Sequence, residues 1–447
     1  MLILNPKSNI RNSKFFQMNY TETIQYLYEQ LPLFTRVGAS AYKADLNNTI
    51  ELCKRLGNPQ HQFKSVHVGG TNGKGSSSHM LAAILQTAGY KTGLYTSPHL
   101  KDFRERIRIN GQMISEGEIV DFVTAHKDDF DDIHPSFFEM TVGLAFDFFA
   151  KQQVDIAIIE VGLGGRLDST NIITPLLSII TNIGWDHMNI LGDSLQLIAA
   201  EKAGIIKPGV PVIIGEYQPE VADIFKEKAK KENSKISFAS ELELDVSGQK
   251  SEMGVSEFLD VKIALPSGNS ELQLDLTGTY QLKNLKTVIS AVDELRLQGF
   301  KISSENLRTA LVQVKTLTGL HGRWEVISKH PLTICDTGHN PEGILEVLQN
   351  IASVAYDKLH FVIGMVNDKD LSKILGLLPV NAIYYFCKPD IPRGLDAENL
   401  KQNAESLGLH GNVYPSVKAA LLCAQQNAGE NDLVFVGGST FVAAEVV

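Results

Sequence analysis

The stretch "VHVGGTNGKGSSSHM" joins a glycine-rich turn to a lysine and a run of serines, a combination typical of phosphate binding. The apolar segment "KSVHV" leads into the turn, and an apolar helical pattern follows it. Gly70, Gly73 and Gly75 allow a tight turn in which backbone N–H groups converge on phosphate oxygens at the positive end of a helix. We expect Lys74 to contact the β- and γ-phosphates of a nucleotide and Ser76 to approach phosphate or metal.

The turn departs from the consensus G-x-x-x-x-G-K-[ST], because Val68 stands where the consensus places its first glycine. A plain strand-to-helix turn with an incidental lysine is therefore the alternative interpretation. The order of strand, turn and helix favours phosphate binding, since a phosphate loop requires that context.

Oxygen and nitrogen side chains follow other predicted strands, at the edge where ligands gather in open α/β sheets. Glu160 ends the strand "VDIAIIE", and Ser97 follows "GLYT". Asp186 and His187 follow "LLSIITNIG". Mg²⁺ accompanies nucleotide triphosphates and prefers oxygen ligands, so imidazole is an uncommon partner and hydrogen-bonded packing is the alternative for His187. We expect these strand ends to meet in one crevice beside Lys74.

Short Val- and Ile-rich segments alternate with helical patterns through the first two-thirds of the chain. Near-continuous apolar strands spaced by helices predict an α/β fold, here a P-loop-type, mostly parallel sheet with helices on both faces. From Phe238 to about Leu276, alternating segments such as "FLDVKIAL" and "ELQLDL" predict a small antiparallel addition. A second α/β alternation after "TLTGLHGRW" predicts a smaller, Rossmann-like C-terminal domain. We place the boundary near Leu320, which gives domains at residues 1–320 and 321–447.

The composition of the chain limits which binding partners and which cellular compartment are expected. The 447 residues carry a formal net charge of -10, which disfavours nucleic acid as a partner. The four cysteines lie far apart without a Cys-x-x-Cys pair, which indicates free thiols in a reducing compartment. No apolar run is long enough for a membrane span, and the start of the chain lacks the pattern of a secretory signal, so we expect the cytoplasm. Whether the residues before Met18 belong to the folded protein is left open by the sequence.

These stretches, with others in the same order, resemble the Mur ligase superfamily, and closely its folylpolyglutamate synthase/dihydrofolate synthase branch. The resemblance runs from about Gly70 to Ser439 through "GTNGKGS", "YTSPHL", "ERIRINGQ", "FFEMT", "EVGLGGRLDSTNI", "WDHMNILG", "EKAGIIKPGVP", "GTYQLKN", "HGRWE", "DTGHNPEG" and "GGS". It accounts for the missing glycine, since this family's loop has its own shorter form. Thr337 and Ser169 stand where members usually carry alanine, which puts details of the pockets in doubt.

The resemblance implies nucleotide and metal roles at the matching positions. The triphosphate cradle is implied at Thr71, Asn72, Gly73 and Lys74, continued by Gly75 and Ser76. Further ATP contacts are implied at Asn284, Arg323 and Asp336, and magnesium ligands, for two ions in all, at Ser97, Glu160 and His187.

It also implies residues for the substrate and for catalysis. Lys202 matches a lysine that the family carries as a carbamate, whereas a plain surface lysine is the alternative. His339 is a candidate for contact with substrate or phosphate. The walls of a pterin pocket are implied at Phe138, Glu139, Leu167, Asp168 and Ser169.

The activity implied by the resemblance is ATP-dependent ligation of L-glutamate to dihydropteroate or to a folate polyglutamate, by a monomer, through an acyl phosphate. A cell-wall ligase that adds amino acids to a UDP-muramyl peptide is one alternative. A P-loop NTPase working as a switch or motor is another. Which of the two folate activities is present, and the length of the glutamate chain, stay open.

Overall fold

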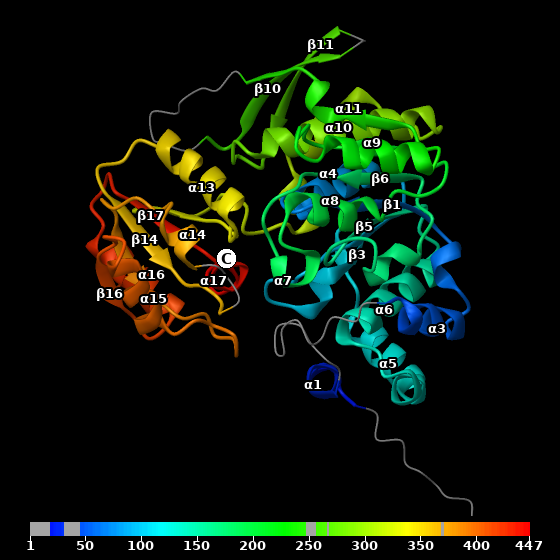
Figure 1. Ribbon diagram of the computed structural model, residues 1–447, viewed down its shortest axis with the longest axis horizontal. Coiled ribbons are helices and arrows are strands. Elements are labelled where there is room, and N and C mark those ends of the chain that lie inside the picture. The colour runs from blue at the N-terminus through cyan, green and yellow to red at the C-terminus, as the bar shows by residue number, and fades with distance from the viewer. Residues whose placement is uncertain (1–17, 31–44, 247–255, 266–267, 368–370) are drawn as a thin grey trace, which may run out of the picture.

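The structure is a computed structural model, and it describes residues 18–30, 45–246, 256–265, 268–367 and 371–447. Two lobes lie side by side, and their contact faces come from distant parts of the chain (Figure 1). The predicted α/β class is confirmed for both lobes. The residues before Met18, on which the sequence was undecided, lie outside the described residues.

The first lobe is built on an eight-stranded sheet in the order β4-β3-β2-β5-β1-β6-β7-β8. Only β3 and β4 run antiparallel to their neighbours. The strands are β1 (Lys64–Gly69), β2 (Thr92–Tyr95), β3 (Ile107–Ile109), β4 (Gln112–Met113), β5 (Ile156–Glu160), β6 (Leu177–Ile180), β7 (Val212–Ile214) and β8 (Ile236–Phe238).

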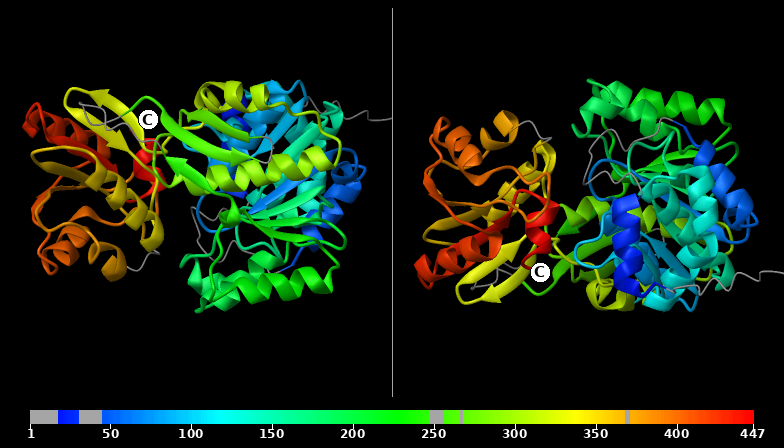
Figure 2. Two further views of the ribbon diagram at one scale, coloured as in Figure 1. Left: turned by 90° about the horizontal axis from the view of Figure 1, so that it is seen from above. Right: turned by 90° about the horizontal axis from the view of Figure 1, so that it is seen from below.

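Helices cover both faces of this sheet, as the views from above and from below show (Figure 2). They are α1 (Tyr20–Gln30), α3 (Asn47–Arg55), α4 (Lys74–Thr87), α5 (Glu116–Ile133), α6 (Phe137–Lys151), α7 (Met188–Leu191), α8 (Leu195–Ala203), α9 (Ala222–Lys231), α10 (Gln281–Leu297), α11 (Ser304–Leu311) and α12 (Val314–Thr318). Successive residues of β5 pack into the hydrophobic cores on opposite faces of the sheet. Ile158 packs with α4 and α10, and Ile159 packs with α3 and α6. This double burial explains why the strands are apolar throughout.

The predicted antiparallel addition is a three-stranded sheet of β9 (Leu244–Val246), β10 (Leu259–Leu265) and β11 (Gly268–Leu274). Val261, Ile263 and Leu272 join the core beneath α10, so the addition extends the first lobe. Short 3₁₀ turns connect other elements at Pro59–His61, Phe103–Arg106, Ser169–Ile172 and Ala239–Glu241.

The second lobe carries a six-stranded sheet in the order β12-β13-β17-β14-β15-β16, parallel except for β12. Its strands are β12 (Glu325–Lys329), β13 (Leu332–Cys335), β14 (Leu359–Ile363), β15 (Ile383–Phe386), β16 (Gly411–Val413) and β17 (Leu433–Gly437). Its helices are α13 (Pro341–Ser353), α14 (Leu371–Leu375), α15 (Ala397–Glu405), α16 (Val417–Asn427) and α17 (Thr440–Ala444).

Residues 319–324 link the lobes, and the expected boundary near Leu320 falls in this linker. Gly319, Gly322 and Trp324 have φ angles of 67°, 69° and 49°, in the left-handed region. Such a φ is unusual for a bulky residue such as tryptophan. It is held because the Trp324 N–H donates to Asp336 Oδ2 over 2.7 Å and the indole is buried in the second-lobe core.

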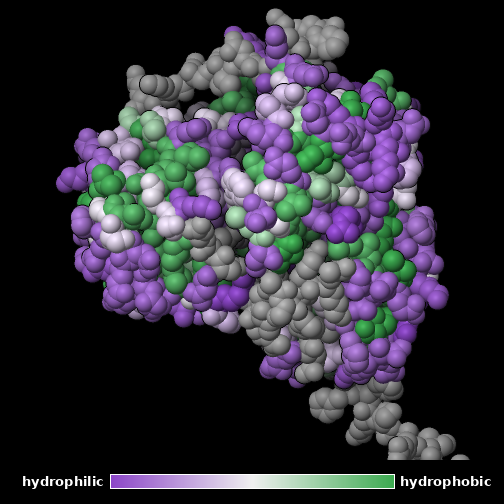
Figure 3. Space-filling view, in the orientation of Figure 1, coloured by the Kyte–Doolittle hydropathy of each residue, from purple (hydrophilic) through white to green (hydrophobic). Residues whose placement is uncertain are grey.

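The exterior of the protein is mostly hydrophilic on one face. On the face shown, hydrophilic side chains dominate and hydrophobic ones gather in patches, one of them over the second lobe (Figure 3). Among the described residues, none of the helices has the length and apolar character needed to cross a bilayer.

Candidate active site

The glycine-rich turn lies between β1 and α4, at the carboxyl edge of the first-lobe sheet. Gly73, just before α4, has a φ of 86°, and a Cβ atom built there would lie 2.1 Å from Asn284 Oδ1. This position therefore requires glycine, both for its φ and for the approach of α10. The Thr71 N–H donates to the Asn182 carbonyl over 2.9 Å, which ties the turn to the loop after β6.

Lys74 is the first residue of α4, and its ammonium group turns back over the loop. Nζ donates to the carbonyl oxygens of Gly70, over 3.1 Å, and of Thr71, over 3.0 Å. The loop thus holds a cation at the positive end of α4, where phosphate binds in loops of this kind.

Two adjoining cavities meet at this lysine. We call the larger one, of about 410 Å³, the loop cavity, and the other, of about 300 Å³, the aromatic cavity. Both are lined by Thr71, Lys74, Ser97, Pro98, His339 and Thr440. A molecule in each would therefore meet the other beside Lys74.

The structure places every site residue expected from the sequence on a wall of one cavity or both. In addition to the shared residues, the loop cavity is lined by Asn72, Gly73, Gly75, Ser76, Glu160, Asn284, Arg323 and Asp336. The aromatic cavity takes Phe138, Glu139, Leu167, Asp168, Ser169, His187 and Lys202.

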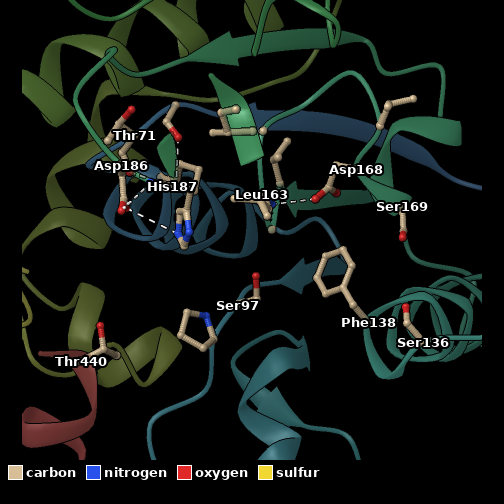
Figure 4. A pocket seen from close by; sticks show the side chains of 18 of the residues that line it. Thr71, Ser97, Ser136, Phe138, Leu163, Asp168, Ser169, Asp186, His187 and Thr440 are labelled. Atoms are coloured by element: carbon tan, nitrogen blue, oxygen red, sulfur yellow. Dashed lines mark hydrogen bonds and ion pairs between the residues drawn. The ribbon is translucent and has the colours of Figure 1, made fainter. Parts of the chain in front are cut away.

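The three expected metal ligands line the two cavities: Ser97 lines both, Glu160 the loop cavity and His187 the aromatic cavity. The buried Glu160 accepts a hydrogen bond from the Ser97 N–H over 3.0 Å. Burial raises the pKa of Glu160, and the charge of Lys74 and the Ser97 N–H group oppose this shift. Figure 4 shows Ser97 and His187 on segments that come from different parts of the first lobe. In the described part of the chain, no group of three or more His, Cys, Asp or Glu side chains is close enough to hold a metal ion.

Asp186 lies between two histidines from different lobes. Its Oδ2 is 3.7 Å from Nε2 of His187 and 3.5 Å from Nε2 of His339. Nδ1 of His339 lies 3.0 Å from the Thr337 carbonyl oxygen, so that ring nitrogen carries the proton and donates. This contact brings the second lobe to the junction of the cavities.

Lys202 reaches the junction from the end of α8. It is buried, with 5% of its surface exposed, and Nζ donates to the Gly70 carbonyl oxygen over 2.9 Å. Burial, reinforced by the charge of Lys74, lowers the pKa of Lys202 to about 7. A plain surface lysine, the alternative from sequence, is therefore wrong. Near neutral pH much of this amine is uncharged and nucleophilic.

The second lobe contributes an arginine and an aspartate to the loop cavity. Arg323 donates to Thr337 Oγ1, and its Nη2 lies 3.5 Å from the Cβ position at Gly75. Asp336 Oδ2 accepts from the Tyr280 hydroxyl over 2.5 Å and from the Trp324 N–H over 2.7 Å. Asp336 thereby joins α10 of the first lobe to the strained end of the linker.

Aromatic and glycine residues form the other cavity (Figure 4). A Cβ at Gly162 would lie 2.3 Å from the Phe138 ring, so the ring rests directly on backbone. The buried Asp168 accepts from the N–H groups of Leu163, over 2.8 Å, and Thr170, over 3.0 Å. Glu139 accepts from the Ser136 N–H over 2.6 Å and completes the capping box of α6.

Comparison with known proteins gives the family. Residues 68–292 match the Mur ligase middle domain, and residues 322–440 match the Mur ligase glutamate ligase domain. The chain is 33% identical to the dihydrofolate synthase/folylpolyglutamate synthase of Bacillus subtilis, over 90% of this chain and 94% of the relative. The chain belongs to this family of Mur ligases.

Other members show the same relation. The folylpolyglutamate synthase of Lacticaseibacillus casei is 31% identical over 96% of this chain and 98% of its own length. The structure of Escherichia coli FolC in complex with DHPP and ADP superposes with a TM-score of 0.83, at 29% identity over 96% of this chain and 97% of that one. A related bifunctional synthase with Mn, AMPPNP and L-glutamate bound superposes with a TM-score of 0.79, at 28% identity over 96% and 97%.

Some residues of this Mur ligase site carried no signal in the sequence. Arg106 and Arg393 line the aromatic cavity, although neither had been assigned a role. Arg106 lies in "ERIRINGQ", where spacing alone does not separate it from its neighbours Arg104 and Arg108. Asn340 exchanges two side-chain hydrogen bonds with Asn72 across the lobes, of 3.2 and 3.1 Å. Only the fold reveals contacts of this kind.

Proposed function

We propose that this Mur ligase uses ATP to join the amine of L-glutamate to the carboxylate of dihydropteroate or of a folate. The observation that carries the proposal is the position of Lys74, at the end of a phosphate-binding turn and on the wall of both cavities. Relatives of these names, and related structures holding ADP with DHPP or AMPPNP with L-glutamate, support the same reaction.

The reaction needs two steps, because a carboxylate does not release an oxygen to an amine at neutral pH. The acceptor carboxylate attacks the γ-phosphorus, the bond to the β,γ-bridging oxygen breaks, and an acyl phosphate and ADP result. The glutamate amine then attacks the acyl carbon, loses a proton, and the tetrahedral intermediate expels phosphate. Lys74 and the N–H groups of the turn neutralise the charge that gathers on the transferred group.

The nucleotide is proposed to fill the loop cavity, with its phosphates over the turn from Thr71 to Ser76. Arg323 brings a second cation beside Gly75 from the other lobe. Asn284 lies against Gly73, and Asp336 faces the same cavity, so both are placed to contact the nucleotide. Because the two lobes share these contacts, their closure also keeps water from the acyl phosphate.

A divalent cation such as Mg²⁺ fits the oxygen atoms at the junction. The buried Glu160 carboxylate, the Ser97 hydroxyl and the His187 ring would hold the cation, as the family resemblance implies. A site with only a few protein ligands is sufficient for Mg²⁺, because the ion keeps several waters and also binds the phosphate oxygens of the nucleotide. When bound, it would supply positive charge to the phosphate oxygens. We propose that two ions bind, as the family resemblance implies.

Lys202 is proposed to carry a carbamate. Its pKa of about 7 leaves a neutral amine that can add CO₂ and release a proton, and the fraction of neutral amine grows as the pH rises through about 7. We expect Lys202→Ala to lower kcat by about tenfold or more, because a buried oxygen ligand beside the loop is lost. A carbonyl signal after exposure to ¹³C-bicarbonate, present in the native protein and absent in the variant, would report the modification. Full activity of Lys202→Ala, indifferent to bicarbonate, contradicts it.

The acceptor is proposed to occupy the aromatic cavity, with its pterin near Phe138, Leu167, Asp168 and Ser169. A flat aromatic wall and a buried carboxylate suit a planar heterocycle that carries N–H donors. Glu139, which the resemblance assigns to this wall, lines the cavity and also caps α6. His339 is proposed to contact glutamate or phosphate, because it lines both cavities.

The wider organisation remains proposed as well. We propose that the lobes correspond to an ATP-binding domain at residues 1–320 and a glutamate-ligase domain at residues 321–447, which the spans of the two family models support. The net charge of -10 gives no attraction to nucleic acid. We propose a monomer in the cytoplasm, for which size-exclusion chromatography with light scattering is the direct check of mass.

A panel assay of phosphate release tests the function. The purified protein is given ATP, Mg²⁺ and L-glutamate with dihydropteroate, tetrahydrofolate or a UDP-muramyl peptide in separate reactions. We expect release that needs both glutamate and a pterin acceptor. Release with the muramyl acceptor alone would make the chain a cell-wall ligase, and hydrolysis independent of any acceptor would make it an NTPase switch.

A further inference from the structure

Arg106 is a buried arginine on the wall of the aromatic cavity. It ends the 3₁₀ turn Phe103–Arg106, directly before β3, and only 6% of its surface is exposed. Its Nε donates to Nδ1 of His99 over 2.7 Å, and the guanidinium lies 5.6 Å from the centre of the Phe137 ring. Hydrogen bond and ring together fix the orientation of the guanidinium against the cavity wall.

Arg106 has no ion-pair partner among the described residues, and Glu160 acts on its charge only from beyond ion-pair distance. No carboxylate in the described part of the chain lies within ion-pair distance of this guanidinium, whereas Arg104, two residues earlier, lies 2.7 Å from Asp102 Oδ2. His99 does not compensate, because burial and the nearby Arg106 lower its pKa to about 3 and keep it neutral. Burial likewise lowers the pKa of Arg106 itself. A buried cation without a counter-ion is costly, so its retention beside a cavity points to an anionic ligand.

A neighbouring hydroxyl also lacks an acceptor for its proton. Tyr95 is fully buried with its hydroxyl beside Arg106, which can only donate, and no acceptor for the O–H group lies within hydrogen-bond distance among the described residues. Burial raises the pKa of Tyr95, and the charge of Arg106 opposes that shift, so the two groups lie close together. A neutral donor beside an unpaired cation is the arrangement that a carboxylate would satisfy.

The reacting carboxylate cannot be that ligand, because it must lie beside Lys74 to reach the γ-phosphate. Lys74 and Arg106 are separate cations, because Lys74 lines both cavities, whereas Arg106 lines the aromatic cavity and not the loop cavity. An anion on Arg106 is therefore a second carboxylate of the same acceptor. Dihydropteroate has one carboxylate only. A folate that already carries glutamate has two on its terminal residue: the γ-carboxylate, which reacts, and the α-carboxylate, which does not.

We propose that Arg106 binds the α-carboxylate of the terminal glutamyl residue of a folate acceptor. This inference rests on the proposed function and makes Arg106 a residue that determines specificity. It would support extension of glutamylated folates while contributing little to the use of dihydropteroate. The same chain could then perform both reactions, with Arg106 engaged in only one.

The test compares two acceptors in Arg106→Gln and in a control, Arg104→Gln, which removes an equal charge from the outer side of the same turn. With tetrahydrofolate monoglutamate we expect kcat/KM of Arg106→Gln to fall about 30-fold or more, mostly through KM, since a charge-assisted hydrogen bond is lost. With dihydropteroate we expect a change within about threefold. Arg104→Gln should leave both values near those of the native protein.

A second comparison leaves the protein intact. Native enzyme is given tetrahydrofolate whose α-carboxylate has been converted to the amide, and its kcat/KM should fall by the same factor. This arm decides the matter if Arg106→Gln fails to fold by circular dichroism. Equal losses with both acceptors, or native kcat/KM for the amide, overturn the inference. A native protein that uses dihydropteroate but never tetrahydrofolate also overturns it while leaving the proposed ligase function standing, whereas inactivity with every pterin acceptor removes the ligase function itself.

Discussion

The loop cavity and the aromatic cavity share a junction but are built differently. The aromatic cavity takes its aromatic wall from α6 and its backbone floor from the loop after β5, both in the first lobe, while His339, Arg393 and Phe441 line it from the second lobe. The loop cavity needs both lobes, because Arg323, Asp336 and Thr337 face the turn from the second lobe. Both cavities therefore draw on both lobes, but the Phe138 wall and its backbone floor belong to one core, whereas the phosphate-binding turn is faced by side chains of the other core.

Helix α13 contributes several contacts to that docking, and Figure 1 shows it facing the first lobe. Glu346 accepts from Nζ of Lys283, over 2.8 Å, and Lys283 also pairs with Glu216 over 3.1 Å. Glu342 accepts from the Trp185 N–H over 3.1 Å, and Asn350 accepts from the Thr279 N–H over 2.7 Å. Together with the amide pair of Asn72 and Asn340, these polar contacts line one side of α13.

The largest effect is expected at Lys74, which serves both cavities. Lys74→Ala should lower kcat by between about 100-fold and 1,000-fold, because charge neutralisation at the transferred phosphoryl group is lost. Steady-state phosphate release measures this, with the exposed Lys226→Ala as the control. An unchanged kcat in a folded variant would mean that the turn connects strand and helix without binding phosphate.

A smaller effect, confined to one cavity, is expected at Phe138. Phe138→Leu keeps an apolar side chain on Gly162 but removes the flat ring, so KM for the pterin acceptor should rise about tenfold. KM for ATP should stay within about twofold. Phe148→Leu, on the same helix outside the cavity, is the matched control. Equal rises in both KM values would show that the two cavities are not independent.

The smallest effect is expected at Asn340, which touches neither cavity. Serine keeps the N-cap of α13, now provided by Asn340 Oδ1 accepting from the Gly343 N–H over 2.8 Å, but cannot reproduce the amide pair with Asn72. Asn340→Ser should raise KM for ATP about fivefold, since one or two modest hydrogen bonds between the lobes are lost. KM for the acceptor should hardly change. A rise in acceptor KM alone would reverse the proposed division between the cavities.

The sequence predicted features that are local in the chain better than those formed by docking. Strand, turn and helix around Lys74 are contiguous, and the Val- and Ile-rich strands are buried on both faces, so their pattern revealed the parallel sheet. The carboxyl ends of parallel strands lie at one edge, which also allowed Glu160 and Ser97 to be placed together. Lys202 and Arg106 could not be recognised as buried, because the sequence alone does not show whether a single charged residue lies on the surface or in the interior.

Contacts between the lobes were equally hidden. Asn72 and Asn340 lie 268 residues apart, and either amide alone resembles an ordinary loop residue. Glu139, which the resemblance placed on a pterin wall, does line the aromatic cavity, but its hydrogen bond with the Ser136 N–H at the start of α6 was not predicted.

The linker has a consequence for building chimeric ligases. With Gly319, Gly322 and Trp324 all at positive φ, the path from one lobe to the next is dictated by the main chain over residues 319–324. The N–H of Trp324 is moreover secured by Asp336, a residue of the lobe that follows. A graft of a foreign C-terminal lobe should therefore be joined ahead of Gly319, so that the imported half brings the entire bend with the carboxylate that holds it.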